Sequence, residues 1–140
     1  MTRFLGIDYG TKRVGLAISD GLGMTARPLE VVPRAKAAER VTELCQEYGV
    51  GMLVVGLPTG LSGDEGEAAT AARALGEELS SASGVPVTYI DERFTSKLAE
   101  SVLLESGMRR RGRRETVDKV AAAIILQSFL DSRSGNSEGG

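Results

Sequence analysis

The feature that most constrains the fold is a change of hydrophobic rhythm near residue 35. Before this point, Arg3 to Asp8 and Arg13 to Ser19 are strand-like segments on either side of the turn-forming stretch Tyr9 to Lys12. A third strand is expected around Leu29 to Val32, after a glycine-containing turn. Three sequential strands with short links are expected to be antiparallel.

Beyond this point the apolar residues recur at the helical period. Ala35 to Tyr48 is expected to be a helix that Gly49 ends, and the apolar run Met52 to Val55 predicts a central strand covered on both faces. The patterns further along predict, in order, a helix over 65–81, a strand over 85–91, and helices over 96–105 and 115–130. An antiparallel meander that passes into βαβ units gives an α/β protein with a mixed five-stranded sheet and helices on both faces. A ribonuclease-H-like fold requires this order.

The length of 140 residues predicts one domain, which we place at 1–131, with a flexible C-terminal tail at 132–140. No stretch approaches the roughly 20 apolar residues of a membrane span, and the N-terminus does not resemble a signal segment. A cytoplasmic location is therefore expected. The single cysteine, Cys45, is expected to be a buried thiol in a helix.

The composition restricts the available chemistry because the chain contains no histidine. Acid, base or metal chemistry must therefore use carboxylates, lysine, tyrosine or water. The formal net charge is −2, but the segment Gly107 to Arg114 carries +5, so the remainder carries −7. The chain thus has one concentrated basic segment in an otherwise acidic protein.

The first candidate site residue is Asp8, which ends an apolar strand. Phe4, Gly6 and Asp8 are expected on one face of that strand, with Leu5 and Ile7 on the other. An aspartate in this place commonly caps a turn through its own backbone. The alternative is a carboxylate at the edge of the sheet that binds a cation.

A second strand also finishes in acidic residues, at Asp91 and Glu92. Sites in α/β sheets form outside the carboxyl ends of parallel strands, so Glu92 could converge with Asp8 if the two strands are parallel and near each other. Asp91 and Glu92 point to opposite faces, so only one of them can join such a site directly. The alternative is an ion pair with Arg93 or Lys97 at the entry to the next helix.

The third acidic candidate, Asp118, lies on the helical stripe of Ala121, Ala122, Ile125 and Phe129. Because that stripe is expected to pack on the sheet, Asp118 should point inward from the first turn of the helix. The helix dipole would stabilise it by only about 0.3–1 kcal/mol, which does not offset removing an unpaired carboxylate from water. A cation or a water-filled cleft is needed there.

Three carboxylates that meet would repel one another or recruit a divalent ion. A site of oxygen ligands suits Mg²⁺ or Mn²⁺, while the absence of histidine and of paired cysteines argues against zinc. Two such ions roughly 4 Å apart can activate water and stabilise the leaving oxygen in phosphodiester hydrolysis. The candidate metal-binding carboxylates are therefore Asp8, one of Asp91 and Glu92, and Asp118.

The basic segment contains Arg109, Arg110, Arg111, Arg113 and Arg114. Such a run is often a solvated loop, because like charges at this density disfavour order. Its place just before Asp118 instead favours contact with nucleic acid at the rim of the acidic site, since arginine forks match phosphate oxygens. The glycine-rich stretch Gly56 to Gly60 is no P-loop, and it either approaches a nucleic-acid backbone or is simply a loop.

Four motifs, in order along nearly the whole chain, closely resemble those of the bacterial YqgF/RuvX family. This resemblance implies a ribonuclease-H-like fold, a divalent metal and nuclease activity, with Holliday junctions and the precursor of 16S rRNA as substrates. It also implies catalytic positions at Asp8, Glu92 and Asp118. The motifs are Gly6 to Gly15, Gly56 to Pro58, Asp91 to Ser96 and Val117 to Gln127.

Within these motifs the residues expected to contact nucleic acid, besides the arginine segment, are Thr11, Lys12, Arg13, Arg93 and Thr95. A second copy of the chain is also an expected partner, because symmetrical incision of a junction favours a dimer. Two other functions remain open. One is a catalytically silent RNA-binding or ribosome-assembly protein. The other is an ATP-binding domain, since Asp8 to Thr11 also resembles the phosphate-binding hairpin of actin and sugar kinases.

Overall fold

The computed structural model describes residues 2–58, 66–91 and 110–139, and in the last range it describes the side chains of 119–133. The strands are β1 (Arg3–Asp8), β2 (Arg13–Ser19), β3 (Ala26–Pro33), β4 (Val50–Leu57) and β5 (Val87–Asp91). The helices are the 3₁₀ helix η1 (Arg34–Lys36), α1 (Ala37–Tyr48), α2 (Glu67–Ser83) and α4 (Arg110–Gly139).

The five strands form one sheet in the order β3-β2-β1-β4-β5. β1, β2 and β3 are antiparallel neighbours, whereas β4 lies parallel to both β1 and β5. This arrangement confirms the mixed sheet expected from the order of the segments. It also brings the ends of β1, β4 and β5 to the same edge of the sheet.

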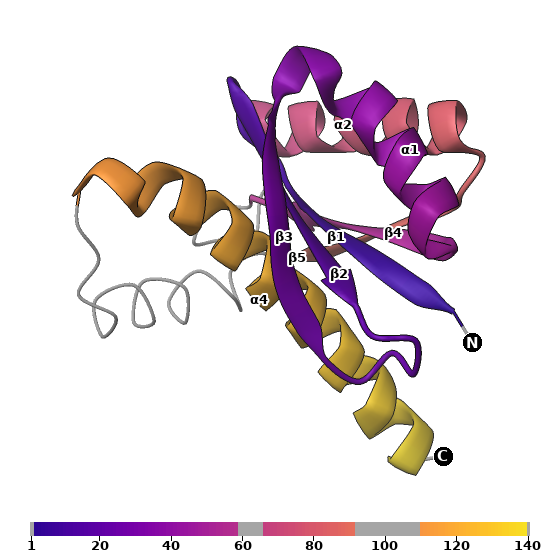
Figure 1. Ribbon diagram of the computed structural model, residues 1–140. Helices are drawn as coiled ribbons and strands as arrows, with labels where there is room; N and C mark the ends of the chain where they lie inside the picture. Colours follow the sequence, from indigo (N-terminus) through magenta and orange to yellow (C-terminus); the bar gives the residue numbers. More distant parts are fainter. Residues whose placement is uncertain (1, 59–65, 92–109, 140) are drawn as a thin grey trace.

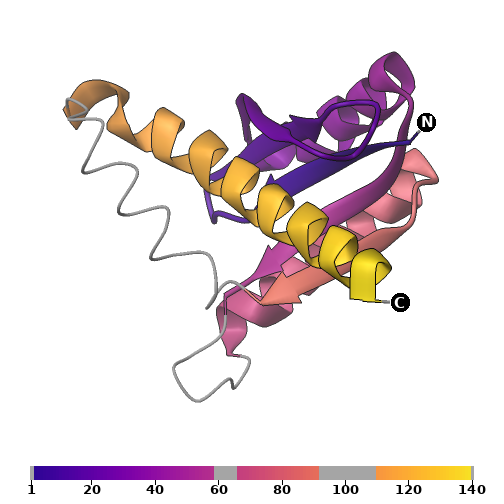
Figure 2. The same cartoon turned by 90° about the horizontal axis from the view of Figure 1, so that it is seen from below.

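The helices cover opposite faces of the sheet (Figure 1, Figure 2). On one face, α1 and α2 bury a large aliphatic core that includes Leu5 and Ile7. On the other face, α4 packs against Phe4, Ala17 and Val54. The N-terminal turns of α4 project beyond the sheet (Figure 1, Figure 2).

The structure corrects several predicted boundaries. Gly56 and Leu57, expected to begin a loop, are the last residues of strand β4, and the third strand is longer than the stretch Leu29 to Val32. The final helix, predicted over 115–130, begins at Arg110 and continues to Gly139. The predicted helix over 96–105 lies outside the described residues, and the domain limits at 131 and 132 stay a prediction.

Candidate active site

Asp8 is the last residue of β1 and lies on the sheet face that α4 covers. Strand alternation places it on the same side as Phe4, which packs with α4, while Leu5 and Ile7 face α1 and α2. The predicted division of β1 into two faces is therefore confirmed. The side chain of Asp8 is half-buried and has an interaction partner.

Glycines flank Asp8 on both neighbouring strands. Asp8 pairs directly with Gly15 on β2. On β4, Gly56 follows Val55, the partner of Ile7, so Gly56 occupies the corresponding position on the other side. Side chains of paired residues share a face, so neither β2 nor β4 contributes a side chain beside the Asp8 carboxylate. Side chains that meet Asp8 on this face must come from other elements.

The helix α4 crosses β1 at Gly6 and runs antiparallel to that strand. The rings of Phe4 and Phe129 have centroids 5.7 Å apart, and a side chain at Gly6 would meet Ala122 and Leu126. Moving from Phe4 to Gly6 along β1 thus corresponds to moving from Phe129 back to the turn between Leu126 and Ala122 along α4.

This register predicts which turn of α4 lies level with Asp8. Two strand residues advance by about 6.6 Å, and one helical turn of four residues by about 6 Å. Two residues beyond Gly6 is Asp8, and one turn before the turn 122–126 is the turn 118–122. The register therefore predicts that the backbone of residue 118 lies about level with Asp8, on the same face of the sheet.

The position of Asp118 within its helix differs from the prediction. Because α4 begins at Arg110, Asp118 is its ninth residue and does not lie in the first turn. Stabilisation by the helix N-terminus falls off within the first turn, so it does not act at this position. The predicted stripe is confirmed at Ala122, Ile125 and Phe129, which all pack on the sheet.

The end of β5 distinguishes the two acidic candidates there. Val87 and Tyr89 pack against the core beneath α1 and α2, whereas Ile90 packs on the α4 side. Asp91 pairs with Leu57, a residue of the α1 and α2 core, so strand alternation puts it on the face opposite Asp8. Asp91 also has an interaction partner. Glu92 lies outside the described residues.

The predicted nucleic-acid-binding residues fall in two described places. Thr11 and Lys12 are exposed in the turn between β1 and β2, and Arg13, half-buried, begins β2. Arg110, Arg111, Arg113 and Arg114 form the first turns of α4, so the alternative of a solvated loop is wrong for these four residues. Arg93, Thr95 and Arg109 lie outside the described residues.

The turn after Asp8 is held by close backbone contacts. A side chain at Gly10 would collide with the carbonyl oxygen of Arg13, so this position requires glycine. The carbonyl oxygen of Lys12 accepts a hydrogen bond of 2.9 Å from the backbone N–H of Arg34. These contacts fix the path of the chain that leaves the candidate site.

Polar contacts tie α4 to the far end of the sheet. The Gln127 side chain accepts a hydrogen bond of 2.8 Å from the N–H of Ala26 and donates one of 3.0 Å to the carbonyl oxygen of Met24. The Arg133 guanidinium lies 4.6 Å from the centre of the Phe4 ring. These contacts could not be predicted, because nothing in the sequence shows that residues 24 and 127 meet.

Two other titratable groups have structural roles. Burial raises the pKa of the Cys45 thiol, as expected for an inert core cysteine. Asp20, which follows β2, accepts a hydrogen bond of 2.8 Å from the Met24 N–H, and this bond is the main cause of its lowered pKa. Asp20 is thus a turn-capping aspartate, at the end of the sheet opposite Asp8.

Two absences apply only to the described parts of the chain. Among the side chains that the structure describes, at 2–58, 66–91 and 119–133, no three acidic, cysteine or histidine groups gather closely enough to hold a metal ion. Among the described helices, none has the length and apolar character needed to cross a membrane.

The sequence matches a known family over almost its full length. The family model described as "RuvX: Holliday junction resolvase" matches residues 2–132. The chain belongs to the RuvX family. Two relatives, both provisionally named pre-16S rRNA nuclease, come from Pelotomaculum thermopropionicum and an Anaeromyxobacter strain. The first is 45% identical and covers 94% of this chain and 88% of the relative; the second is 48% identical and covers 94% and 98%.

Solved structures place this RuvX-family chain in a fold class. Thermus thermophilus RuvC, solved in complex with a Holliday junction substrate, superimposes with a TM-score of 0.61 at 22% identity over 96% of this chain and 97% of RuvC. A second structure of that protein gives a TM-score of 0.59 at 19% identity, with the same coverage of both chains. At this identity the likeness shows the fold, and the predicted ribonuclease-H-like architecture is confirmed.

Proposed function

We propose that this chain is a divalent-metal-dependent endonuclease that hydrolyses phosphodiester bonds in structured nucleic acid. The observation that carries the proposal is the register of α4 on β1, set by the contacts of Gly6 and Phe4, from which we expect the backbone of residue 118 about level with Asp8 on one face of the sheet. Membership of the RuvX family supports the same activity. We assign Asp8, Glu92 and Asp118 as the metal-binding carboxylates.

The choice of Glu92 over Asp91 is supported by strand alternation. Asp91 is on the α1 and α2 face, so the next residue falls on the α4 face if the pleat of β5 continues by one position. On that face Gly56 of β4 lies between β1 and Ile90 of β5, and it has no side chain. Carboxylates from β1 and from the chain after β5 can then approach each other across it.

The residues of this chain fit a hard divalent cation. The three proposed ligands are carboxylates, and a chain without histidine offers no imidazole to a softer metal. When bound, Mg²⁺ or Mn²⁺ supplies activation of water and stabilisation of the leaving oxygen. The carboxylates of this chain hold the ions, and Asp8 sits at the sheet edge, where a nucleic-acid backbone can reach it.

The test of the site compares Asp8→Asn, Glu92→Gln and Asp118→Asn with wild type. Each substitution removes a charged metal ligand and should lower Mg²⁺- or Mn²⁺-dependent cleavage at least about 100-fold, while nucleic-acid binding largely persists. Asp20→Asn is the matched control, because Asp20 directly follows a strand but caps a turn. Equal cleavage by wild type and all three variants would reject the assignment. Binding without cleavage by wild type would favour a silent RNA-binding protein.

The substrate we propose is precursor 16S rRNA, because the relatives at 45% and 48% identity are named as nucleases of pre-16S rRNA. The likeness to RuvC concerns the fold and gives less support to a four-way DNA junction. A cleavage assay should compare a precursor rRNA fragment, a four-way junction and a matched duplex, each with Mg²⁺ and with Mn²⁺. Preferential cleavage of the junction would contradict the RNA assignment and leave the nuclease assignment intact.

We also propose that the arginines at the start of α4 bind the phosphate backbone. They lie in the same helix as Asp118, in the turns that project past the sheet (Figure 1). Arg111→Ala should weaken binding and reduce the slope of log affinity against log salt by about 0.9 if one duplex phosphate contact is lost. Arg27→Ala, at an exposed position on β3 at the opposite end of the sheet, is the control. An unchanged slope in Arg111→Ala would remove this residue from the interface.

A further inference from the structure

The helix α4 approaches the sheet very closely at Gly6. A Cβ atom placed on Gly6 would lie 2.7 Å from the Cβ of Leu126 and 2.8 Å from the carbonyl oxygen of Ala122. Carbon atoms in contact normally lie about 3.5–4.0 Å apart. The helix therefore occupies a height above β1 that only glycine permits.

The atoms that oppose Gly6 belong to the body of the helix. One is a backbone carbonyl oxygen and the other is a Cβ, so no flexible side chain can turn aside to make room. On either side of this point the sheet and helix are also packed, since Ala122 and Leu126 are completely buried. A methyl group at position 6 must therefore displace this part of α4 from the sheet.

We propose that Gly6 is a positioning residue, which sets the distance between the turn of α4 that carries Asp118 and the end of β1 that carries Asp8. Gly6 lies two residues before Asp8, and Ala122 lies one helical turn after Asp118, so the contact adjoins both carboxylate positions. The inference rests on the proposed metal-dependent nuclease. A methyl group added at Gly6 should therefore increase the distance between Asp8 and Asp118, two of the proposed metal ligands, without altering either side chain.

The expected size of the effect follows from the tolerance of such sites. Catalytic groups tolerate displacements of only about 0.5 Å from their productive geometry, and a misplacement of about 1 Å can lower the reaction rate about 100-fold. Relief of the contacts at Gly6 requires a shift of this order, because 2.7 Å is well below ordinary carbon contact. Gly6→Ala should therefore lower kcat about 10- to 100-fold and weaken Mn²⁺ affinity by a similar factor.

The experiment compares Gly6→Ala with a matched glycine on the other face of the sheet. Gly76 on α2 is also crowded, since a Cβ there would lie 2.6 Å from the Tyr89 hydroxyl oxygen. Both variants receive three measurements: the separation of the Cα atoms of residues 8 and 118 in crystal structures, Mn²⁺ affinity by calorimetry, and kcat and KM at a temperature where the protein is folded. Only Gly6→Ala should increase the separation and weaken Mn²⁺ binding, with Gly76→Ala within about twofold of wild type.

The outcomes separate this inference from the proposed nuclease activity. An unchanged separation and Mn²⁺ affinity in folded Gly6→Ala would overturn the positioning role, even if wild type cleaves RNA. Changes in both, with no cleavage by wild type, would support the positioning role and reject the nuclease. If Gly6→Ala does not fold, Ala122→Ser adds a single oxygen atom from the helix side, where Ala122 is fully buried, and the same measurements decide.

Discussion

The two faces of the sheet differ in what they bury. The face beneath α1 and α2 is filled by large aliphatic side chains, such as Leu5, Leu16 and Leu53, all completely buried. The face beneath α4 has small residues at the contact, including Ala17 and Ala122. Three sheet glycines, Gly6, Gly15 and Gly56, also lie on this second face, around Asp8.

This difference separates stability from the proposed chemistry. Large side chains bury the most apolar area, so the α1 and α2 face supplies most of the hydrophobic stabilisation. Small residues let backbones approach closely and leave no sheet side chain beside the carboxylate on β1. The comparison predicts that substitutions on the first face affect folding and that substitutions on the second affect catalysis.

The largest expected effect is on stability, from Leu53→Ala on the α1 and α2 face. Leu53 is completely buried in the centre of β4, so the substitution should lower the free energy of unfolding by about 2–5 kcal/mol. Urea denaturation measures this loss. At a temperature where the variant remains folded, kcat should equal that of wild type, and a large fall in kcat would break the division between the two faces.

The next effect is on cleavage, from Gly56→Ala on the α4 face. The added methyl group would lie between β1 and Ile90 of β5, where we propose that Asp8 and Glu92 approach each other. Cleavage should therefore fall at least about 10-fold. Gly51→Ala is the control on the same strand, because its methyl group would meet only the side chain of Thr2. Equal activity of these two variants would show that the absence of a side chain at Gly56 is unimportant for catalysis.

The sequence predicted the parts of the fold that depend on local pattern. The bounds of β1 and β2 and the face of Asp8 were predicted correctly, because two-residue alternation and a short hairpin determine them. The pairing of Asp8 with Gly15 could also have been deduced, since the tight turn between the strands sets their register. The predicted start of α4 was wrong because arginine has a good helix propensity, and repulsion among the arginines does not prevent the helix from beginning at Arg110.

The parts that the sequence could not predict are long-range contacts. The three acidic candidates follow from local sequence patterns. Asp8 and Glu92 come at the ends of predicted strands, and Asp118 is a charged residue on an apolar helical stripe. The proposed proximity of Asp8 and Asp118 depends on where α4 crosses β1, and Gly6 and Gln127 make close contacts between α4 and the sheet. Neither contact leaves a periodic signal, because it joins residues about a hundred positions apart.

A smaller effect is expected at the polar contacts that hold α4. Gln127→Ala removes the acceptor for the Ala26 N–H and the donor to Met24, which should cost about 1–2 kcal/mol and reduce hydrogen-exchange protection at residue 26. Gln46→Ala, at an exposed position on α1, should change stability by less than about 0.5 kcal/mol. Similar losses in the two variants would show that α4 is held by apolar packing alone.

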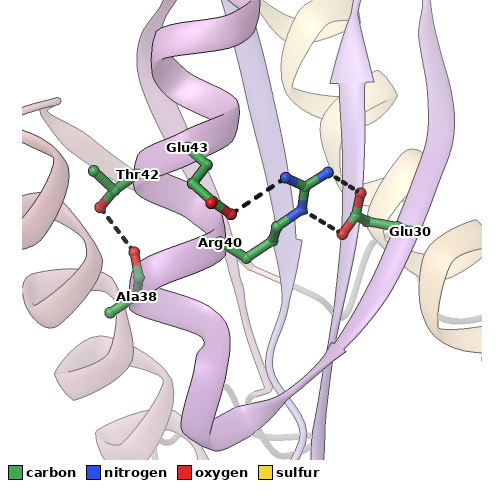
Figure 3. Close-up of polar contacts among 5 residues, drawn as sticks. All are labelled: Glu30, Ala38, Arg40, Thr42 and Glu43. Carbon is green, nitrogen blue, oxygen red and sulfur yellow. Dashed lines mark hydrogen bonds and ion pairs between the residues drawn. The ribbon is translucent and has the colours of Figure 1, made fainter.

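The smallest effect is expected where α1 meets the edge strand β3. Arg40 donates hydrogen bonds of 2.8 and 2.9 Å to the two carboxylate oxygens of Glu30, and it also contacts Glu43 (Figure 3). The hydrogen bonds from Arg40 lower the pKa of Glu30, more than desolvation raises it. Because both side chains are about one-third exposed, the pair should contribute at most about 1 kcal/mol.

The pH dependence of this pair has a definite sign. A carboxylate whose pKa is lowered by folding adds stability above its unfolded pKa, near the ordinary value of 4.5, and this stability is lost as the pH falls through the lower folded value. Glu30→Gln should therefore be slightly less stable than wild type at pH 7, and the difference should shrink as the pH is lowered below 4.5. Urea midpoints at pH 7 and at a series of lower pH values measure it. A difference that does not shrink as the pH falls would mean that Glu30 contributes through packing on α1 and not through its charge.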